Sequence, residues 1–301
     1  MTTVPVIHPN WSRPPRDMTD GYSLEMTARD RAALLEAAPH IAPETPIAVT
    51  FLPQESIDAR IAAAVTARQL GFEPMPHLSA RRIASHAELD QTVARCVAEA
   101  GVTRMFLVAG DPPVPAGPFP DTLSLLATGL FERHGIRAIG IAGHPESHPA
   151  MDEATRWAAL EAKRDDLTRR GIATLIVTQF GFDAAPVLDW LRRLRDRGID
   201  APVRLGVAGP AGIKTLLRYA AHCGVGASAA VMARYGVSLG HLLGTAGPDR
   251  LVNALGSGLT PAHGAVRLHF YPFGGLGRTV DWINDYAARK DSRARRIGAE
   301  R

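Results

Sequence analysis

The sequence has only two cysteines in 301 residues and no apolar run long enough to cross a bilayer. Cys96 and Cys223 fall in expected helices without CxxC spacing, which argues against a disulfide framework or a zinc site and favours small buried residues. We therefore expect no bound metal. The N-terminus, MTTVPVIHPNWSRPPRD, lacks the charged-then-apolar layout of a secretory signal. These absences predict a cytoplasmic protein that does not enter the membrane.

The chain has no charge excess outside its last residues. Its formal net charge is +4, and residues 289–301, with six basic and two acidic side chains, account for all of it. Aromatic residues are only 6% of the chain. Without aromatic interleaving or a basic helix face in the body, nucleic-acid binding is not expected. The basic end is expected to be a disordered, solubilising tail.

The sequence does contain a regular alternation of apolar strand-like runs and helical runs. Strands that alternate with helices imply crossover connections and a parallel sheet. About eight such units in a chain of this length predict an α/β fold with a single domain, the (β/α)₈ TIM barrel. The expected strands are 21–26, 46–52, 74–78, 104–109, 137–142, 174–178, 203–207 and 266–271. The expected helices are 29–38, 57–70, 87–100, 122–133, 151–170, 184–197, 214–222 and 279–288.

The pattern also suggests how the chain is divided. Residues 1–20 are expected to form an N-terminal arm, 21–288 the catalytic barrel and 289–301 the basic C-terminal tail. The stretch 224–263 is longer than one connection needs. It predicts extra helical structure between the seventh and eighth strands, with a helix at 248–255.

Polar side chains follow the carboxyl end of nearly every expected strand. In 136–149, IRAIGIAGHPESHP, an apolar run stops at Gly143 and opens into two histidines and a carboxylate. The carboxyl ends of barrel strands face one mouth, where ligands bind. Glu25 ends an apolar run and is suited to deliver a proton, and Asp111 follows a glycine that lets its loop approach a flat ligand. The strand-end groups are Glu25, Thr50, His77, Gly110, Asp111, His144, His148, Gln179, Gly209 and Tyr271.

In this order the motifs resemble the 5,10-methylenetetrahydrofolate reductases, flavin-dependent barrel enzymes of one-carbon metabolism and methionine biosynthesis. The resemblance covers roughly residues 21–290 and rests on AVTF at 48–51, PHLS at 76–79, AGDPP at 109–113, HPESHP at 144–149, VTQFGFD at 177–183 and LHFY at 268–271. It implies FAD across the barrel mouth and a folate that alternates with NAD(P)H on the flavin face. Hydride then moves from nicotinamide to flavin N5 and on to the exocyclic methylene carbon of the folate.

The resemblance also implies residue roles. Glu25 matches the family's proposed general acid, which helps open the five-membered folate ring. Asp111 matches an aspartate near the flavin pyrimidine edge that also contacts the pterin and tunes the flavin. The matched cofactor-binding positions are Thr50, Phe51, His77, Ala109, Gly110, Asp111, His144, His148, Lys163 and Arg164. The matched folate-binding positions are Glu25, Asp111, Gln179, Tyr271 and Arg278.

The chain departs from the family pattern at several of these positions. Ala109 stands where an arginine is usual, and His144 stands where a tyrosine is usual. The opening motif FEFFPP is SLEMTA here, and the PFGGLGR after the last strand aligns Arg278 only across a gap. These departures predict altered flavin and nicotinamide sites. They motivate the hypothesis that the reaction runs chiefly from methyl- to methylenetetrahydrofolate.

Three alternatives stay open at this point. The chain is compatible with a flavin-independent folate reductase, with a folate-binding paralogue that lacks turnover, and with a barrel lyase of other chemistry. The lyase hypothesis uses the loop at Gly209, whose backbone N–H groups precede a helix and suit an anion. Nothing in the sequence fixes the oligomeric state, so a homo-oligomer stays open.

Overall fold

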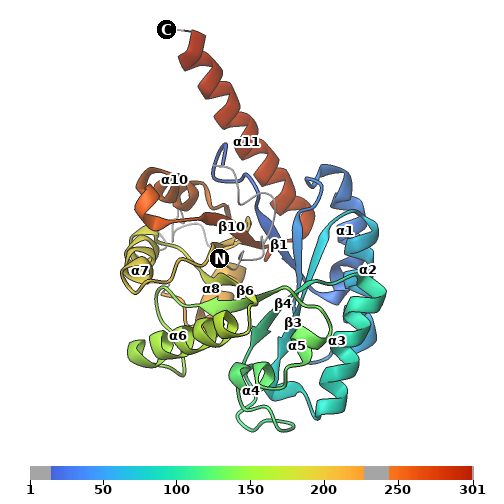
Figure 1. The fold of residues 1–301 in the computed structure, drawn as a ribbon. Helices are drawn as coiled ribbons and strands as arrows, with labels where there is room; N and C mark the ends of the chain where they lie inside the picture. The colour runs from blue at the N-terminus through green and yellow to red at the C-terminus, as the bar shows by residue number, and fades with distance from the viewer. Residues whose placement is uncertain (1–14, 227–243, 300–301) are drawn as a thin grey trace.

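The computed structural model describes residues 15–226 and 244–299. Within these ranges eight parallel strands close into a barrel in chain order, and the first strand pairs with the last. This closure confirms the predicted (β/α)₈ TIM barrel (Figure 1). The strands are β1 (Ser23–Met26), β2 (Pro46–Val49), β3 (Glu73–Ser79), β4 (Arg104–Val108), β5 (Ala138–Gly143), β6 (Ala173–Gly181), β7 (Val203–Ala208) and β10 (Val266–Tyr271).

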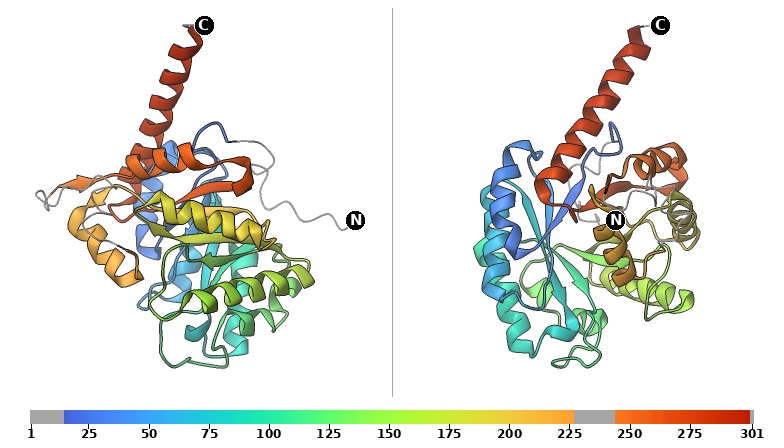
Figure 2. Two further views of the ribbon diagram at one scale, coloured as in Figure 1. Left: turned by 90° about the vertical axis from the view of Figure 1, so that its left-hand side faces the viewer. Right: turned by 180° about the vertical axis from the view of Figure 1, so that it is seen from behind.

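Helices cover the outside of the barrel and return the chain from one strand to the next (Figure 2). The side chains of Ser56, Ser85 and Asp152 accept hydrogen bonds from backbone N–H groups and so fix where three of the helices begin. The expected helix at 122–133 is in fact two helices, because Gly129 has a φ of +66° between them. The helices are α1 (Arg31–Ala37), α2 (Ile57–Gln69), α3 (His86–Ala100), α4 (Thr122–Leu126), α5 (Leu130–Arg133), α6 (Glu153–Arg169), α7 (Ala184–Asp196), α8 (Ile213–Cys223), α10 (Asp249–Gly258) and α11 (Leu276–Ala299).

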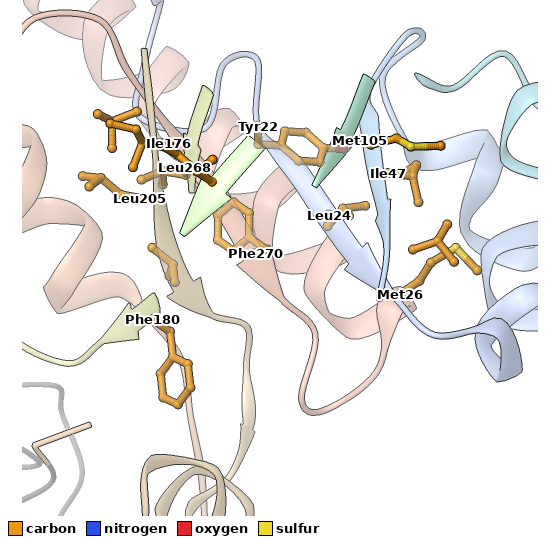
Figure 3. Packing of buried hydrophobic residues seen from close by; sticks show 14 of the residues in the cluster. Tyr22, Leu24, Met26, Ile47, Met105, Ile176, Phe180, Leu205, Leu268 and Phe270 are labelled. Atoms are coloured by element: carbon orange, nitrogen blue, oxygen red, sulfur yellow. The ribbon is translucent and has the colours of Figure 1, made fainter. Parts of the chain in front are cut away.

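Side chains alternate between the two faces of each strand, and this period of two decides what lines the barrel. Residues on the outer face, such as Leu24, Ile47 and Phe270, belong to the main hydrophobic core (Figure 3). A smaller cluster on the other face fills the barrel interior and consists of Ala48, Met75, Phe106, Leu175 and Val177.

The barrel interior carries charge at the amino ends of its strands. Arg204 is buried there, and its burial together with the nearby Arg104 and Arg267 lowers its pKa to about 9. Arg104 lies 3.9 Å from a carboxylate oxygen of Glu73 on the adjacent strand. The apolar cluster lies between these arginines and the mouth at the carboxyl ends of the strands. Apolar side chains therefore separate the polar groups at the two ends of the barrel.

The connection between β7 and β10 contains the extra structure that the sequence predicts. It holds α8, α10 and the short antiparallel pair β8 (Ala211–Gly212) and β9 (Thr245–Ala246). Helix α10 matches the helix expected at 248–255. Residues 227–243 of this connection lie outside the described residues, as do residues 1–14 of the predicted arm.

Helix α11 differs from the expectation at the C-terminus. We expected a helix that ends at residue 288, followed by a disordered tail, but α11 continues to Ala299 and extends away from the barrel (Figure 1). Ion pairing helps this extension, because Arg289 lies 2.8 Å from Asp249 of α10. None of the helices in the described part of the chain has both the length and the apolar composition of a membrane span.

Candidate active site

The centre of the mouth is Glu25, which lies between two imidazoles. Its Oε2 atom is 3.9 Å from His77 Nε2 on β3 and 3.7 Å from His269 Nε2 on β10. The other ring nitrogen of His269, Nδ1, is 2.9 Å from Ser23 Oγ. Ser23, Glu25 and His269 come together because their strands are neighbours and all three residues point into the barrel. This geometry links the Glu25 carboxylate to a hydroxyl through one imidazole.

His269 and Ser23 are missing from the residues that the sequence indicated. The signal for both is the period of two: His269 precedes Tyr271 by two residues, and Ser23 precedes Glu25 by two. A strand that ends on a functional side chain carries the residue two positions earlier on the same face, one layer deeper. Both residues are fully buried, with exposures of 1% and 0%.

His77 is a neutral imidazole at neutral pH. Burial lowers its pKa to about 4, even though the nearby Glu25 carboxylate acts in the opposite direction. Its ring lies 4.6 Å from the ring of Phe106 inside the barrel. The contact with Glu25 is therefore not an ion pair at neutral pH, and His77 lines the mouth as an uncharged polar side chain.

Gln179 reaches the mouth through an irregularity in β6. The register against β7 shifts between Val177 and Phe180, and such a bulge re-aims the side chain that it carries. Gly206 of β7 makes room for the bulge, since a Cβ there would lie 2.5 Å from the Thr178 carbonyl oxygen. The Tyr271 hydroxyl donates to the same oxygen at 3.0 Å. The bulge thus brings Gln179 close to Tyr271, two residues that the sequence predicted at the mouth.

Helix α8 closes this side of the mouth with Cys223. The Cys223 thiol hydrogen-bonds with Gln179, and burial, followed by the negative charge of Glu25, raises its pKa. The helix is held by Tyr219, whose ring stacks 4.0 Å from that of Phe273 after β10. Cys96 is buried as expected, but Cys223 is only partly buried and faces the site. The expectation of a small core residue is therefore wrong for Cys223.

Asp111 lies at the rim of the mouth, with 72% of its side chain exposed. Gly110 before it has a φ of +91°, and a Cβ there would collide with the hydroxyl of Ser79. Burial acts to raise the pKa of Asp111, but hydrogen bonds from Arg82 outweigh it and lower the pKa. Ala109 is exposed beside this turn. The structure thus puts Asp111 on the edge and leaves the centre to Glu25.

Thr50 and Phe51 follow β2 on the same side as Asp111. The Thr50 backbone N–H donates to Met26 O at 2.8 Å. The Phe51 ring lies 4.1 Å from the Arg60 guanidinium and 5.4 Å from that of Arg82. Both residues are partly exposed and accessible from the mouth.

The loop after β5 brings two more predicted residues together. The His144 and His148 rings meet edge to face at 4.7 Å. Burial, then the proximity of His148, Lys163 and Arg156, lower the pKa of His144 to about 3. Burial also lowers the pKa of Lys163 on α6 to about 8, against the opposing effect of Asp121. The two imidazoles are thus neutral beside a partly desolvated ammonium group.

The same loop contains Glu146, to which the sequence assigned no role. Its Oε2 accepts a hydrogen bond from the Gly226 N–H at 3.2 Å, and burial raises its pKa. Arg156 donates to the carbonyl oxygens of His144 and Glu146 from the other side. A cavity of about 90 Å³ lies behind the loop, lined in part by Trp157. Glu146 therefore connects the loop to the segment that follows α8 through its hydrogen bond with Gly226.

Two predicted residues lie apart from these clusters. Arg164 donates to Gly198 O at 3.1 Å and pairs with Asp165 at 2.7 Å, at the end of the barrel opposite the mouth. Its expected place beside a cofactor is therefore wrong. Arg278 is exposed on the first turn of α11, at the carboxyl end of β10. The Gly209 N–H already donates to Tyr271 O at 2.9 Å, which removes it as an anion donor and weakens the lyase hypothesis.

Comparisons with known proteins show the family of the chain. The family model described as Methylenetetrahydrofolate reductase matches residues 45–271. Methylenetetrahydrofolate reductase (NADH) 1 of Arabidopsis thaliana is 30% identical over 135 residues, which are 41% of this chain and 23% of that protein. Methylenetetrahydrofolate reductase 2 of Saccharomyces cerevisiae is 26% identical over 146 residues, 46% of this chain and 24% of that protein. The chain thus matches less than a quarter of the length of these relatives.

A solved structure shares the fold over most of the chain. It is described as an uncharacterized protein from Clostridium thermocellum that binds two copies of 5-methyl-5,6,7,8-tetrahydrofolic acid. It superposes with a TM-score of 0.62 at 11% identity, over 88% of this chain and 94% of that one. At this identity the likeness concerns the barrel architecture.

Proposed function

The chain belongs to the methylenetetrahydrofolate reductase family, and we propose that it is an oxidoreductase that interconverts 5,10-methylenetetrahydrofolate and 5-methyltetrahydrofolate. The cofactor that we assign to this reaction is FAD, and the co-substrate is NAD(P)H. The observation that carries the proposal is the position of Glu25, a carboxylate in the centre of the mouth between His77 and His269. A ligand of the same class, 5-methyltetrahydrofolic acid, is described for the Clostridium thermocellum neighbour.

The residues around the mouth fit a flavin dinucleotide. Gly110 is required by the turn itself, because its φ is +91° and a Cβ there would collide with Ser79; this turn sets the position of Asp111 at the rim where a flat ring would lie. Lys163 forms no ion pair within the described ranges, and its partly buried ammonium group suits a diphosphate. We assign Thr50, Phe51, His77, Ala109, Gly110, Asp111, His144, His148 and Lys163 to FAD. When bound, FAD supplies a carrier that accepts hydride from nicotinamide and returns it to the folate carbon.

The chain's own residues supply the proton chemistry. Opening the five-membered folate ring requires a proton on the departing nitrogen, and Glu25 is the carboxylate that we assign to deliver it. The imidazole of His269 lies between Glu25, 3.7 Å from its Nε2, and the Ser23 hydroxyl, 2.9 Å from its Nδ1, and so fixes the polar surroundings of the carboxylate. Burial, then the charge of Glu25, keep the Tyr271 phenol neutral by raising its pKa well above the usual value.

Gln179, Asp111, Tyr271 and Arg278 are the residues that we assign to the folate. The Gln179 Oε1 accepts a hydrogen bond from the Phe180 N–H at 3.0 Å, so its amide N–H₂, one proton of which faces the Cys223 thiol, is the group that can donate to a ligand. Arg278, exposed at the rim, suits the negatively charged end of the folate.

A second candidate, in which nicotinamide reduces the folate directly without flavin, has one observation in its favour. Ala109 offers no charge beside Gly110, and Arg164 points to the opposite end of the barrel, so Lys163 alone of these three positions supplies a cation. The folate-binding residues are the same in both candidates.

The absorbance spectrum and the half-reactions of the purified protein test the proposal. We expect flavin bands near about 450 nm, bleaching by NAD(P)H without oxygen, and return of the bands on addition of methylenetetrahydrofolate. A colourless protein that still reduces methylenetetrahydrofolate with NAD(P)H would establish the second candidate. A protein that neither binds a tetrahydrofolate nor changes its oxidation state would contradict both.

A further inference from the structure

Arg82 reaches from one strand-end loop to the functional carboxylate of the next. It ends the short 3₁₀ turn η4 (Ala80–Arg82), directly after β3. Its Nε and Nη2 atoms donate to Asp111 Oδ1 at 3.2 and 2.6 Å. The Arg82 side chain is only 22% exposed, whereas that of Asp111 is 72% exposed. The arginine is thus the fixed partner of the pair and the aspartate the accessible one.

The neighbouring Arg81 already holds the backbone of the Asp111 loop. Its backbone N–H donates to Ala109 O at 2.9 Å, and its guanidinium donates to Pro112 O at 3.0 Å and to Pro120 O at 2.8 Å. The loop therefore does not need Arg82 to keep its path. What Arg82 adds is confined to the Asp111 carboxylate.

Both hydrogen bonds from Arg82 go to a single oxygen of Asp111. This arrangement leaves Oδ2 as the oxygen that the arginine does not use. A carboxylate with one occupied oxygen presents an acceptor of defined direction. The Arg82 guanidinium also lies 5.4 Å from the Phe51 ring, which restricts its rotation.

We propose that Arg82 is a further positioning residue of this site: it holds the Asp111 carboxylate through Oδ1 and directs Oδ2 toward the N–H groups of a bound pterin. The inference rests on the proposed function in its choice of ligand. The charged or titratable groups that face the Asp111 carboxylate are Arg82 and, from α8, His222. Removing Arg82 therefore lets Asp111 take up a proton at a higher pH.

The experiment compares the wild type with Arg82→Gln, Arg82→Lys and Asp111→Asn. The dissociation constant of 5-methyltetrahydrofolate is measured from pH 4.5 to pH 8, and the Asp111 carboxyl is titrated by ¹³C NMR, assigned by its loss in Asp111→Asn. Because the pair is partly exposed, we expect Arg82→Gln to weaken binding at neutral pH by about twofold to fivefold. The Asp111 titration midpoint should rise. Arg82→Lys should restore part of both effects.

Two controls separate this role from a structural one. In the Asp111→Asn background, Arg82→Gln should have no further effect on folate binding. Arg95→Gln removes an arginine that pairs with Asp58 and Glu99 and should leave both readouts unchanged.

The two readouts also separate this inference from the proposed function. If the protein binds folate but the Asp111 titration midpoint is the same in Arg82→Gln as in the wild type, the inference is overturned and the proposed function is not. The inference is also overturned if Arg82→Gln weakens folate binding equally in the Asp111→Asn background. No tetrahydrofolate binding by the wild type overturns the proposed function and the pterin half of the inference. In that case a raised midpoint in Arg82→Gln still supports the electrostatic role of Arg82.

Discussion

The buried imidazole of His77 makes the stability of the protein depend on pH in a predictable direction. Its folded-state pKa is about 4, below the value of about 6.5 for an unfolded chain. Between these values the unfolded chain binds a proton that the folded chain does not. The free energy of unfolding therefore falls as the pH falls from about 6.5 toward 4.

The size of this effect follows from the shift. The difference of about 2.5 pKa units corresponds to about 3 kcal/mol once the pH is below both values. At pH 5, His77 lowers the free energy of unfolding by about 2 kcal/mol relative to pH 8. His144, whose pKa is lowered to about 3, also lowers the free energy of unfolding of the wild type as the pH falls. The contribution of His77 is therefore isolated by substitution.

The assay is urea unfolding at pH 8 and pH 5, followed by tryptophan fluorescence, for the wild type, His77→Asn and His77→Gln. Both variants lose packing against Phe106 at every pH, which shifts their stability by a constant amount. Both should lose about 2 kcal/mol less than the wild type between pH 8 and pH 5. If both variants keep the wild-type difference, His77 is not the neutral buried group that we describe.

Two backbone substitutions test how the mouth is positioned. Gly206→Ala places a methyl group 2.8 Å from the backbone carbon of Gln179; we expect a loss of about 1–3 kcal/mol in urea unfolding and weaker folate binding, because the bulge must move. Unchanged folate affinity would show that Gln179 does not contact the ligand. Gly110→Ala adds a side chain at a φ of +91° against Ser79. It should cost at least about 1–2 kcal/mol and displace Asp111, and cofactor affinity is the measurement that detects the displacement.

The sequence is sufficient to predict the barrel and most of the mouth. Apolar runs bounded by glycine and proline locate the strands, and a parallel barrel brings their carboxyl ends to one opening. Glu25, His77, Gln179 and Tyr271 lie at this opening because each is one of the last three residues of its strand. Their catalytic and binding roles stay predictions.

The remaining differences have local physical causes. Lys163 and Arg164 are neighbours on α6 and point about 100° apart, so they contact different neighbours: Lys163 lies near Asp121, whereas Arg164 donates to Gly198 O. The β6 bulge depends on the space left by Gly206 on another strand, which no local pattern reports. Helix α11 continues past residue 288 to Ala299, and its Arg289 pairs with Asp249 of α10, a contact between segments far apart in sequence.

The most direct test of the central claim is the rate of folate reduction by Glu25→Gln. The variant keeps the shape of the side chain but cannot deliver the proton. We expect folate turnover to fall by about 10²–10⁴-fold, while cofactor content and folate affinity stay near those of the wild type. Glu36→Gln, an exposed glutamate on α1, serves as the control and should turn over normally. Unchanged folate turnover in Glu25→Gln would contradict the role that we give to the carboxylate between the two imidazoles.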